Sequence, residues 1–380
     1  MKSISIRIEG EYWDYLIKYN ALFLWTFEGT LEIYDWEYLL NDLSYKMKDN
    51  NIYKFFRGNI NSILLNVHNK DMKESSKINL RKSEIQKYKV REFWISTNDL
   101  IISLDSYNDD LLLNTDEGLL LCNLKEILVD SNNIHTNTLT KEKYYEKIFD
   151  MPFFDISIGN YGNVALAGGE EGVFEFVMPQ KKYNETNEVK HIIKKQSNKV
   201  DWLKNSIYNT SPIEESFILN KPIERGVWNY NDYKIYEDSQ IFRKNDENVY
   251  HSNISWANNN KIYRVVDSRQ LQEVTVQNFG NGELAFRSRY INFMEWKGDI
   301  LAGAGTSFGT VVECENALVV IFKNKDFINI PGEIVRWKYY KSNERYSNLL
   351  GVIFDKSIVL QAFEPNNYFK IRSINKSYFE

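Results

Sequence analysis

The chain has 380 residues, a formal net charge of −5 and 43% hydrophobic residues, and 15% of its residues are aromatic. This length and hydrophobic content are sufficient for one large domain, and the aromatic side chains favour β-strands. The negative charge argues against a dominant basic surface of the kind that binds nucleic acid. No apolar run approaches the roughly 18 residues that a membrane-spanning helix requires, so no membrane association is expected.

The N-terminal residues 3–8 alternate between polar and apolar side chains. This pattern predicts a strand and lacks the continuous apolar core of a signal peptide, so a cytoplasmic location is expected. The two cysteines, Cys122 and Cys314, lie singly in apolar stretches. Such cysteines are expected to be buried thiols rather than a disulfide or metal ligands.

A hairpin and a helix are the next predicted elements. Residues 22–25 and 30–33 are short apolar strands around a turn that contains Glu28 and Gly29. Asp35 can cap a helix, because its carboxylate can accept a hydrogen bond from a backbone N–H of the first turn. The apolar residues of this helix recur at three- and four-residue spacing; they are Trp36, Leu39, Leu40, Leu43 and Met47. We expect the helix to form part of an insertion over about residues 35–90.

Two later segments, residues 101–122 and 155–176, share one order of elements. Each reads as a short strand, a polar turn, a second strand, a tight turn with acidic residues and glycine, and a third strand. Acidic residues followed by glycine between apolar runs strongly predict a hairpin, because glycine supplies the positive φ.

Residues 181–204 contain seven lysines and three acidic residues. We expect an insertion over about residues 180–204. One interpretation is a solvated segment between two blades. The other is a docking arm for an acidic partner or for nucleic acid, and Lys181–Lys204 is the one segment of the chain suited to binding nucleic acid.

The same order of elements recurs in four more segments, at residues 227–239, 254–268, 294–312 and 335–357. These four segments, the two at residues 101–122 and 155–176 and the hairpin at residues 22–33 make seven copies. Their average spacing is roughly the 40–50 residues of one four-stranded propeller blade.

In this pattern the chain resembles the β-propeller superfamily, of the WD40-like or quinoprotein-like kind. No Gly-His and Trp-Asp pairs, kelch glycine doublets or calcium-binding loops occur to identify the subfamily. The resemblance implies one all-β domain over residues 1–380, with about seven four-stranded blades (six to eight) and short helical insertions. It also implies that the N-terminal strand, residues 3–8, completes the last blade, which removes an exposed sheet edge.

The hairpin turns supply the first candidate binding residues. If the copies are aligned correctly, these turns share one face of the propeller and form a ring of negative potential; alternatively, acidic residues are chosen there for backbone reasons alone. The residues are Glu28, Asp116, Glu117, Glu170, Glu171, Asp238, Asp267 and Asp355.

Four tryptophans close the predicted first strands of the last four copies: Trp228, Trp256, Trp296 and Trp337. Most simply they pack between adjacent blades as core. The alternative is a binding surface, where tryptophan is a frequent anchor.

No residue pattern indicates catalysis. The four histidines have no metal-type partner at short spacing and no nucleophile motif nearby, and no cofactor motif occurs, so no catalytic residue, metal or cofactor is assigned. The expected function is a non-catalytic protein-interaction scaffold or accessory subunit of a bacterial complex, which binds another protein through a propeller face. The alternatives are a hydrolase or lyase that uses channel carboxylates on a saccharide-like ligand, and a small-ligand sensor. In propellers the innermost strand of each blade lines a central channel, and a cluster of Asp, Arg and aromatic side chains in that channel would favour these alternatives.

Overall fold

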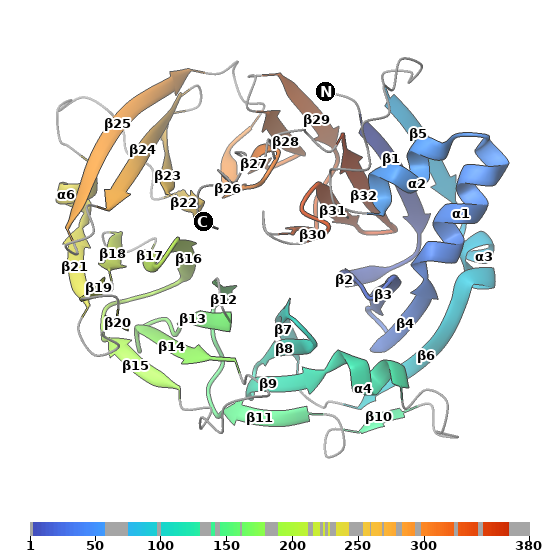
Figure 1. Cartoon of the computed structure of the whole chain (residues 1–380), viewed down its shortest axis with the longest axis horizontal. Helices are drawn as coiled ribbons and strands as arrows, with labels where there is room; N and C mark the ends of the chain where they lie inside the picture. The colour runs from blue at the N-terminus through green and yellow to red at the C-terminus, as the bar shows by residue number, and fades with distance from the viewer. Residues whose placement is uncertain are drawn as a thin grey trace, which may run out of the picture. The chain divides into compact units, whose positions relative to one another are not determined.

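The computed structural model of the chain describes eighteen segments (Figure 1). These are residues 3–57, 75–96, 100–129, 138–140, 145–159, 162–178, 189–211, 216–220, 223–224, 227–228, 233–242, 254–258, 260–267, 270–278, 283–292, 298–322, 326–340 and 345–364. The chain divides into two compact units. The first comprises Met1–Trp94, Thr306–Val311 and Asn316–Glu380, and the second Ile95–Gly305 and Val312–Glu315.

The described residues form an all-β fold with seven four-stranded blades and a few short helices, which confirms the predicted fold class. The first blade falls in the first unit up to Trp94. Its strands are β2 (Tyr12–Lys18), β3 (Ala21–Thr26), β4 (Thr30–Asp35) and β6 (Lys89–Ser96). Between β4 and β6 lie α1 (Trp36–Met47), α2 (Asn50–Phe56), α3 (Lys82–Ile85) and a 3-10 turn, η2 (Gln86–Tyr88).

Helix α1 begins where the sequence predicts. The Asp35 carboxylate accepts a hydrogen bond from the Tyr38 backbone N–H at 2.8 Å, which caps the helix. Trp36, Leu39, Leu40 and Leu43 are buried on one face, whereas Met47 at the end of the helix is exposed.

The seventh blade contains the N-terminal strand. Its strands follow the order β30 (Arg336–Tyr339), β31 (Leu349–Phe354), β32 (Ser357–Phe363) and β1 (Ser3–Glu9), and β5 (Ser75–Leu80) adds a fifth, parallel strand. β1 pairs antiparallel with β32, with Ile6 opposite Leu360. Ile4, Ile6 and Ile8 are fully buried, as the alternation of polar and apolar residues in β1 requires.

The sixth blade consists of β26 (Ile300–Gly305), β27 (Gly309–Cys314), β28 (Ala317–Phe322) and β29 (Phe327–Pro331), and the division between the units passes through it. In the first unit, β27 and β28 share an apolar core with β31 and β32 that includes Val311, Leu318, Val352 and Phe363.

The second unit holds the second to fifth blades. The second blade consists of β7 (Ile101–Tyr107), β8 (Asp110–Thr115), β9 (Gly118–Asn123) and β11 (Tyr145–Phe149), and the third of β12 (Asp155–Ile158), β13 (Asn163–Ala167), β14 (Val173–Val177) and β15 (Lys190–Ile193). The fourth blade consists of β16 (Lys199–Leu203), β17 (Ser206–Thr210), β18 (Phe217–Asn220) and β21 (Lys234–Glu237). The fifth consists of β22 (Ser255–Asn258), β23 (Lys261–Asp267), β24 (Gln270–Asn278) and β25 (Leu284–Asn292). The remaining elements are α4 (Leu124–Val129), β10 (Thr138–Thr140), the paired β19 (Ile223–Glu224) and β20 (Val227–Trp228), and α6 (Asp238–Ile241).

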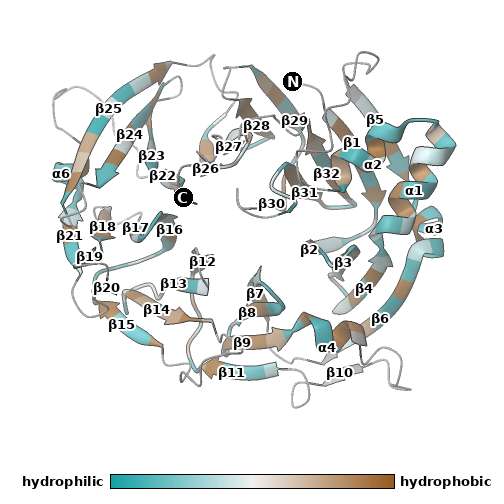
Figure 2. Ribbon diagram, viewed as in Figure 1, coloured by the Kyte–Doolittle hydropathy of each residue, from teal (hydrophilic) through white to brown (hydrophobic). Residues whose placement is uncertain are grey.

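Apolar side chains of neighbouring blades pack against one another in this unit. The second and third blades share a core around Leu112, Leu119, Val164 and Phe176, and further cores join the third to the fourth and the fourth to the fifth. Figure 2 shows the apolar character of β9 and β14 in these cores. The first strands β7, β12, β16, β22 and β26 contact one another in that order.

Two of the seven predicted copies are out of register. For the fourth copy the sequence predicts strands at residues 227–239, but the first three strands of the fourth blade are β16, β17 and β18, and residues 234–237 form its fourth strand. The β17–β18 turn lacks the acidic-glycine pattern on which the prediction depends. For the sixth copy, residues 300–302 belong to the first strand rather than the second.

The basic segment 181–204 contributes strands to two blades. Residues 190–193 form β15, the fourth strand of the third blade, and residues 199–203 form β16, the first strand of the fourth. Val200 and Leu203 are buried in the blade cores. Residues 181–188 lie outside the described part of the chain.

Among the described residues, no helix has both the length and the apolar character needed to cross a bilayer.

Candidate functional site

Each blade has an end at which its second strand turns into its third, here called the hairpin end. Because the strands are antiparallel, the first strand begins at this same end. Ile101 pairs with Thr115 in the second blade, and Asp155 pairs with Ala167 in the third. The residue before the first strand therefore lies beside the turn.

In the second blade this end carries Leu100, Asp116 and Glu117. The Leu100 backbone N–H donates to Asp116 Oδ1 at 2.7 Å, and the Asp116 backbone N–H donates to the Leu100 carbonyl at 3.0 Å. Gly118 has a φ of 138°, and a Cβ there would lie 2.1 Å from the Phe149 carbonyl oxygen. The turn is thus fixed, while Leu100 is 70% exposed and both carboxylates face solvent.

In the third blade the corresponding residues are Phe154, Glu170 and Glu171. Phe154 is 65% exposed, and its ring lies over Gly169, where a Cβ would come within 2.5 Å of the ring. The backbone of Gly169 exchanges two hydrogen bonds with Ser197, at 2.8 and 2.9 Å. Glu170 and Glu171 lie in the turn that these hydrogen bonds hold in place, and both are exposed.

These two hairpin ends belong to neighbouring blades of one unit, since β7 and β12 contact each other. Within the described segments, no lysine or arginine forms an ion pair with Asp116, Glu117, Glu170 or Glu171. We call Leu100, Phe154 and these four carboxylates the acidic face of the second unit.

The first unit repeats the combination at two other blades. Glu28 lies in the β3–β4 turn beside the exposed Phe27, and Asp355 lies in the β31–β32 turn. Val335, which precedes β30, donates its backbone N–H to the Ile353 carbonyl at 2.9 Å and is half exposed.

One acidic residue predicted at a hairpin turn lies elsewhere. Asp238 begins α6 after the fourth strand of its blade and forms an ion pair with Arg264 at 3.2 Å. Asp267 ends β23 and pairs with Gln270, the first residue of β24, so it lies at the hairpin end of the fifth blade. Its side chain lies outside the described part of the structure. In the sixth blade the turn between the second and third strands, β27 and β28, contains Glu315, whose backbone N–H donates to the Asp299 carbonyl at 3.1 Å. The sequence pattern does not predict Glu315 at a hairpin turn, because it places the strands of this blade out of register.

The predicted tryptophans do not form one surface. Trp256 is fully buried, stacks on Tyr263 and covers Gly303 of the neighbouring first strand, as core packing between blades predicts. Trp337 is partly buried beside the apolar core of the sixth and seventh blades. The side chain of Trp228 and all of Trp296 lie outside the described residues.

Charged residues on the first strands were missed by sequence reasoning. Asp155 accepts a hydrogen bond from the Val200 backbone N–H, and Asp201 accepts one from the Ala257 backbone N–H, both at 3.0 Å. The signal in the sequence is an apolar residue followed by Asp in successive first strands. Burial raises the pKa of Asp155 to about 7; the attraction of Lys199 opposes this shift, and the charge of Asp201 adds to it. Lys199 Nζ itself donates to the Gly303 carbonyl at 3.0 Å.

A related cluster lies in the first unit. The Asp14 carboxylate, with a side chain 2% exposed, pairs with Arg336 at 2.9 Å and Lys338 at 3.5 Å. The Arg336 guanidinium also lies 5.4 Å from the centre of the Trp13 ring. These contacts join β30 to β2, the first strands of their blades.

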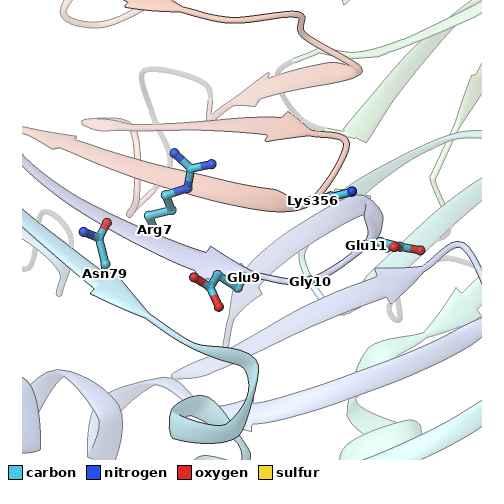
Figure 3. A pocket seen from close by; sticks show the side chains of 6 residues that line it. All are labelled: Arg7, Glu9, Gly10, Glu11, Asn79 and Lys356. Carbon is cyan, nitrogen blue, oxygen red and sulfur yellow. The ribbon is translucent and has the colours of Figure 1, made fainter.

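A pocket of about 640 Å³ lies at the hairpin end of the seventh blade (Figure 3). It is lined by Arg7, Glu9, Gly10, Glu11, Asn79 and Lys356. The lining thus combines two cations and two carboxylates from β1, the residues after it and the β31–β32 turn.

The cysteines are buried and unpaired with each other. Burial raises the pKa of Cys122 to about 12 and that of Cys314 to about 11, which keeps both thiols protonated. Among the described residues, no group of three or more His, Cys, Asp or Glu side chains is placed to hold a metal ion.

No protein-family model matches the sequence, and no curated protein matches it. The solved structures that are similar to the chain include a streptogramin B lyase, with 8% identity over 94% of each chain and a TM-score of 0.48. They also include a computationally designed protein, Ika8, with 7% identity over 94% of this chain and 99% of its own and a TM-score of 0.47. The assignment of the fold depends on the sheets of the chain itself, of which seven are blades. By fold, the chain is a seven-bladed β-propeller.

Proposed function

We propose that the chain is a non-catalytic protein-interaction scaffold that binds a basic partner through the acidic face of the second unit. The observation that supports this most strongly is the pair of exposed apolar side chains, Leu100 and Phe154, beside four exposed carboxylates on neighbouring blades. Apolar anchors with a charged rim are the composition of a docking surface.

The two kinds of side chain have different energetic roles. Full burial of a leucine or phenylalanine side chain contributes about 1.5–3 kcal/mol, so Leu100 and Phe154 would supply affinity. Exposed carboxylates contribute mainly to the rate of association, and salt screens them over a Debye length of about 8 Å. The partner we infer is a protein segment with lysine or arginine residues around an apolar side chain.

The alternative of a hydrolase, lyase or sensor would use the charged groups of the first strands. Asp155 and Asp201 each accept a backbone N–H of the next first strand, and Asp14 is buried against Arg336 and Lys338. Although these are the residue types that would favour a ligand site, their contacts hold neighbouring strands together. We therefore prefer the scaffold.

The experiment is co-purification from the native host with two charge-reversal variants. One carries Glu117→Lys, Glu170→Lys and Glu171→Lys on the acidic face. The control carries Glu126→Lys on α4 and Glu146→Lys on β11, which are exposed carboxylates of the second blade away from its hairpin turn.

We expect a basic protein to co-purify with the wild-type chain and the control at low salt, and to be lost from the triple variant or at high salt. Equal recovery of the same proteins by all three forms would overturn the proposal.

A further inference from the structure

The pocket at the hairpin end of the seventh blade is formed by the outward side of β1. Ile6 and Ile8 point into the core and are fully buried, so Arg7 and Glu9 project from the opposite side of the strand. Arg7 lies opposite Asn79 of the parallel neighbour β5. Both charged side chains are therefore positioned by a strand that is paired on both edges.

The pocket holds opposite charges that do not neutralise one another. Arg7 and Lys356 supply the cations, and Glu9 and Glu11 supply the carboxylates (Figure 3). Within the described segments none of these four side chains forms an ion pair. A ligand that carries both signs of charge could satisfy an acidic and a basic group at once.

Gly10 forms a part of the lining that no larger residue could provide. Its φ is 153°, and a Cβ at this position would lie 2.5 Å from the Tyr12 ring. Its backbone N–H donates to the Lys356 carbonyl at 3.1 Å, which ties the residues after β1 to the β31–β32 turn. The backbone of the pocket is thus held in place before any ligand binds.

The spacing of Arg7 and Glu9 along β1 sets a lower limit on the length of the ligand. Arg7 and Glu9 are two residues apart on a strand, so their Cα atoms are separated by about 6.6 Å. An extended dipeptide places its terminal amine and carboxylate at a similar separation, since each residue spans at most about 3.3–3.6 Å. The volume of about 640 Å³ is within the usual range of small-molecule sites, about 300–1,000 Å³.

We propose that this pocket binds a zwitterion of dipeptide length, whose carboxylate faces Arg7 and whose amine faces Glu9. The site is independent of the acidic face of the second unit. Because its charged groups are exposed, each ion pair contributes a few-fold in affinity, and binding is in the millimolar range.

The test uses the full chain labelled with 15N-glycine, in which the assigned Gly10 amide reports binding at the pocket. Ala-Ala is titrated first, followed by N-acetyl-Ala-Ala, which lacks the amine charge, and Ala-Ala amide, which lacks the carboxylate. The variants are Arg7→Gln and Glu9→Gln, and the matched control is Arg287→Gln, an exposed arginine of the second unit.

We expect Ala-Ala to shift the Gly10 resonance with saturation and each capped peptide to bind two- to fivefold more weakly. In Arg7→Gln the difference between Ala-Ala and its amide disappears while the difference from the acetylated peptide remains; Glu9→Gln gives the reverse, and Arg287→Gln behaves as wild type. No saturable shift of Gly10, or equal affinity for all three peptides, overturns the proposal.

Discussion

Asp155 joins the third blade to the fourth, and its charge is poorly accommodated where it lies. Burial raises its pKa to about 7, although Lys199 and the backbone N–H groups of Val200 and Ile156 favour the ionised form. In the unfolded chain an aspartate titrates near about 3.9. Between about pH 4 and pH 7 the folded protein therefore holds a proton that the unfolded chain has released, so its stability falls as the pH rises through this window.

Replacement of this carboxyl by an amide tests that pH dependence. Asp155→Asn keeps an oxygen that can accept the Val200 N–H but removes the charge. We expect the variant to unfold less readily than wild type at pH 8, by on the order of 2 kcal/mol, with little difference at pH 4. Urea denaturation across pH 4–8 measures this, with Asp155→Ala as the control that also loses the hydrogen bond. A variant less stable than wild type at pH 8 would refute the inferred cost of the charge.

The residues that sequence reasoning missed are those whose importance arises from distant contacts. The acidic turn residues Glu117 and Glu171 could be predicted because a glycine follows each within a local hairpin pattern. Phe154 could not, since its exposure depends on where β12 begins relative to the turn of its own blade. Asp155 could not either, because its partner Val200 lies 45 residues away.

At the scale of elements, the hairpins were more predictable than the blades. The pattern around Gly118 and Gly172 identifies β8–β9 and β13–β14 correctly, because a tight turn with positive φ is a local requirement. A hairpin does not reveal which strands of a blade it joins. In the sixth blade the pattern therefore predicts a second strand at residues 300–302, whereas these residues lie on β26, the first strand.

Strand β1 is the element on which the seventh blade depends most. It pairs with β32 along its full length and also carries β5 on its other side. Its removal would expose the edge of β32 and uncover the apolar side chains that Ile4, Ile6 and Ile8 now bury.

Deletion of residues 1–9 should consequently lower the melting temperature by many degrees and promote aggregation. The loss of three fully buried isoleucines alone removes roughly 5–9 kcal/mol of apolar burial, at about 1.5–3 kcal/mol each. Deletion of residues 1–2 is the matched control and should leave the melting temperature unchanged. Circular dichroism measures the melting temperatures. If both truncated chains melt at the same temperature, β1 does not stabilise the blade.

At the scale of the whole molecule, charge and apolar exposure point to the same kind of partner. The chain carries a net charge of −5, and some of its exposed carboxylates lie beside exposed apolar side chains at hairpin ends in both units. A basic partner would be attracted by this charge and anchored by the apolar residues. The fold class follows from a repeated local pattern, whereas the partner depends on surfaces that only the folded chain brings together.

The most direct test of the proposed docking surface is photo-crosslinking in the native host, with p-benzoylphenylalanine in place of Phe154. The comparison position is Tyr45, which is 85% exposed and lies on α1 rather than in a hairpin turn. We predict one dominant crosslinked protein, basic in character, from position 154, and its loss when Glu170→Lys and Glu171→Lys are added. Crosslinking of the same proteins from both positions, or none from position 154, would contradict the assignment of this face as a protein-binding surface.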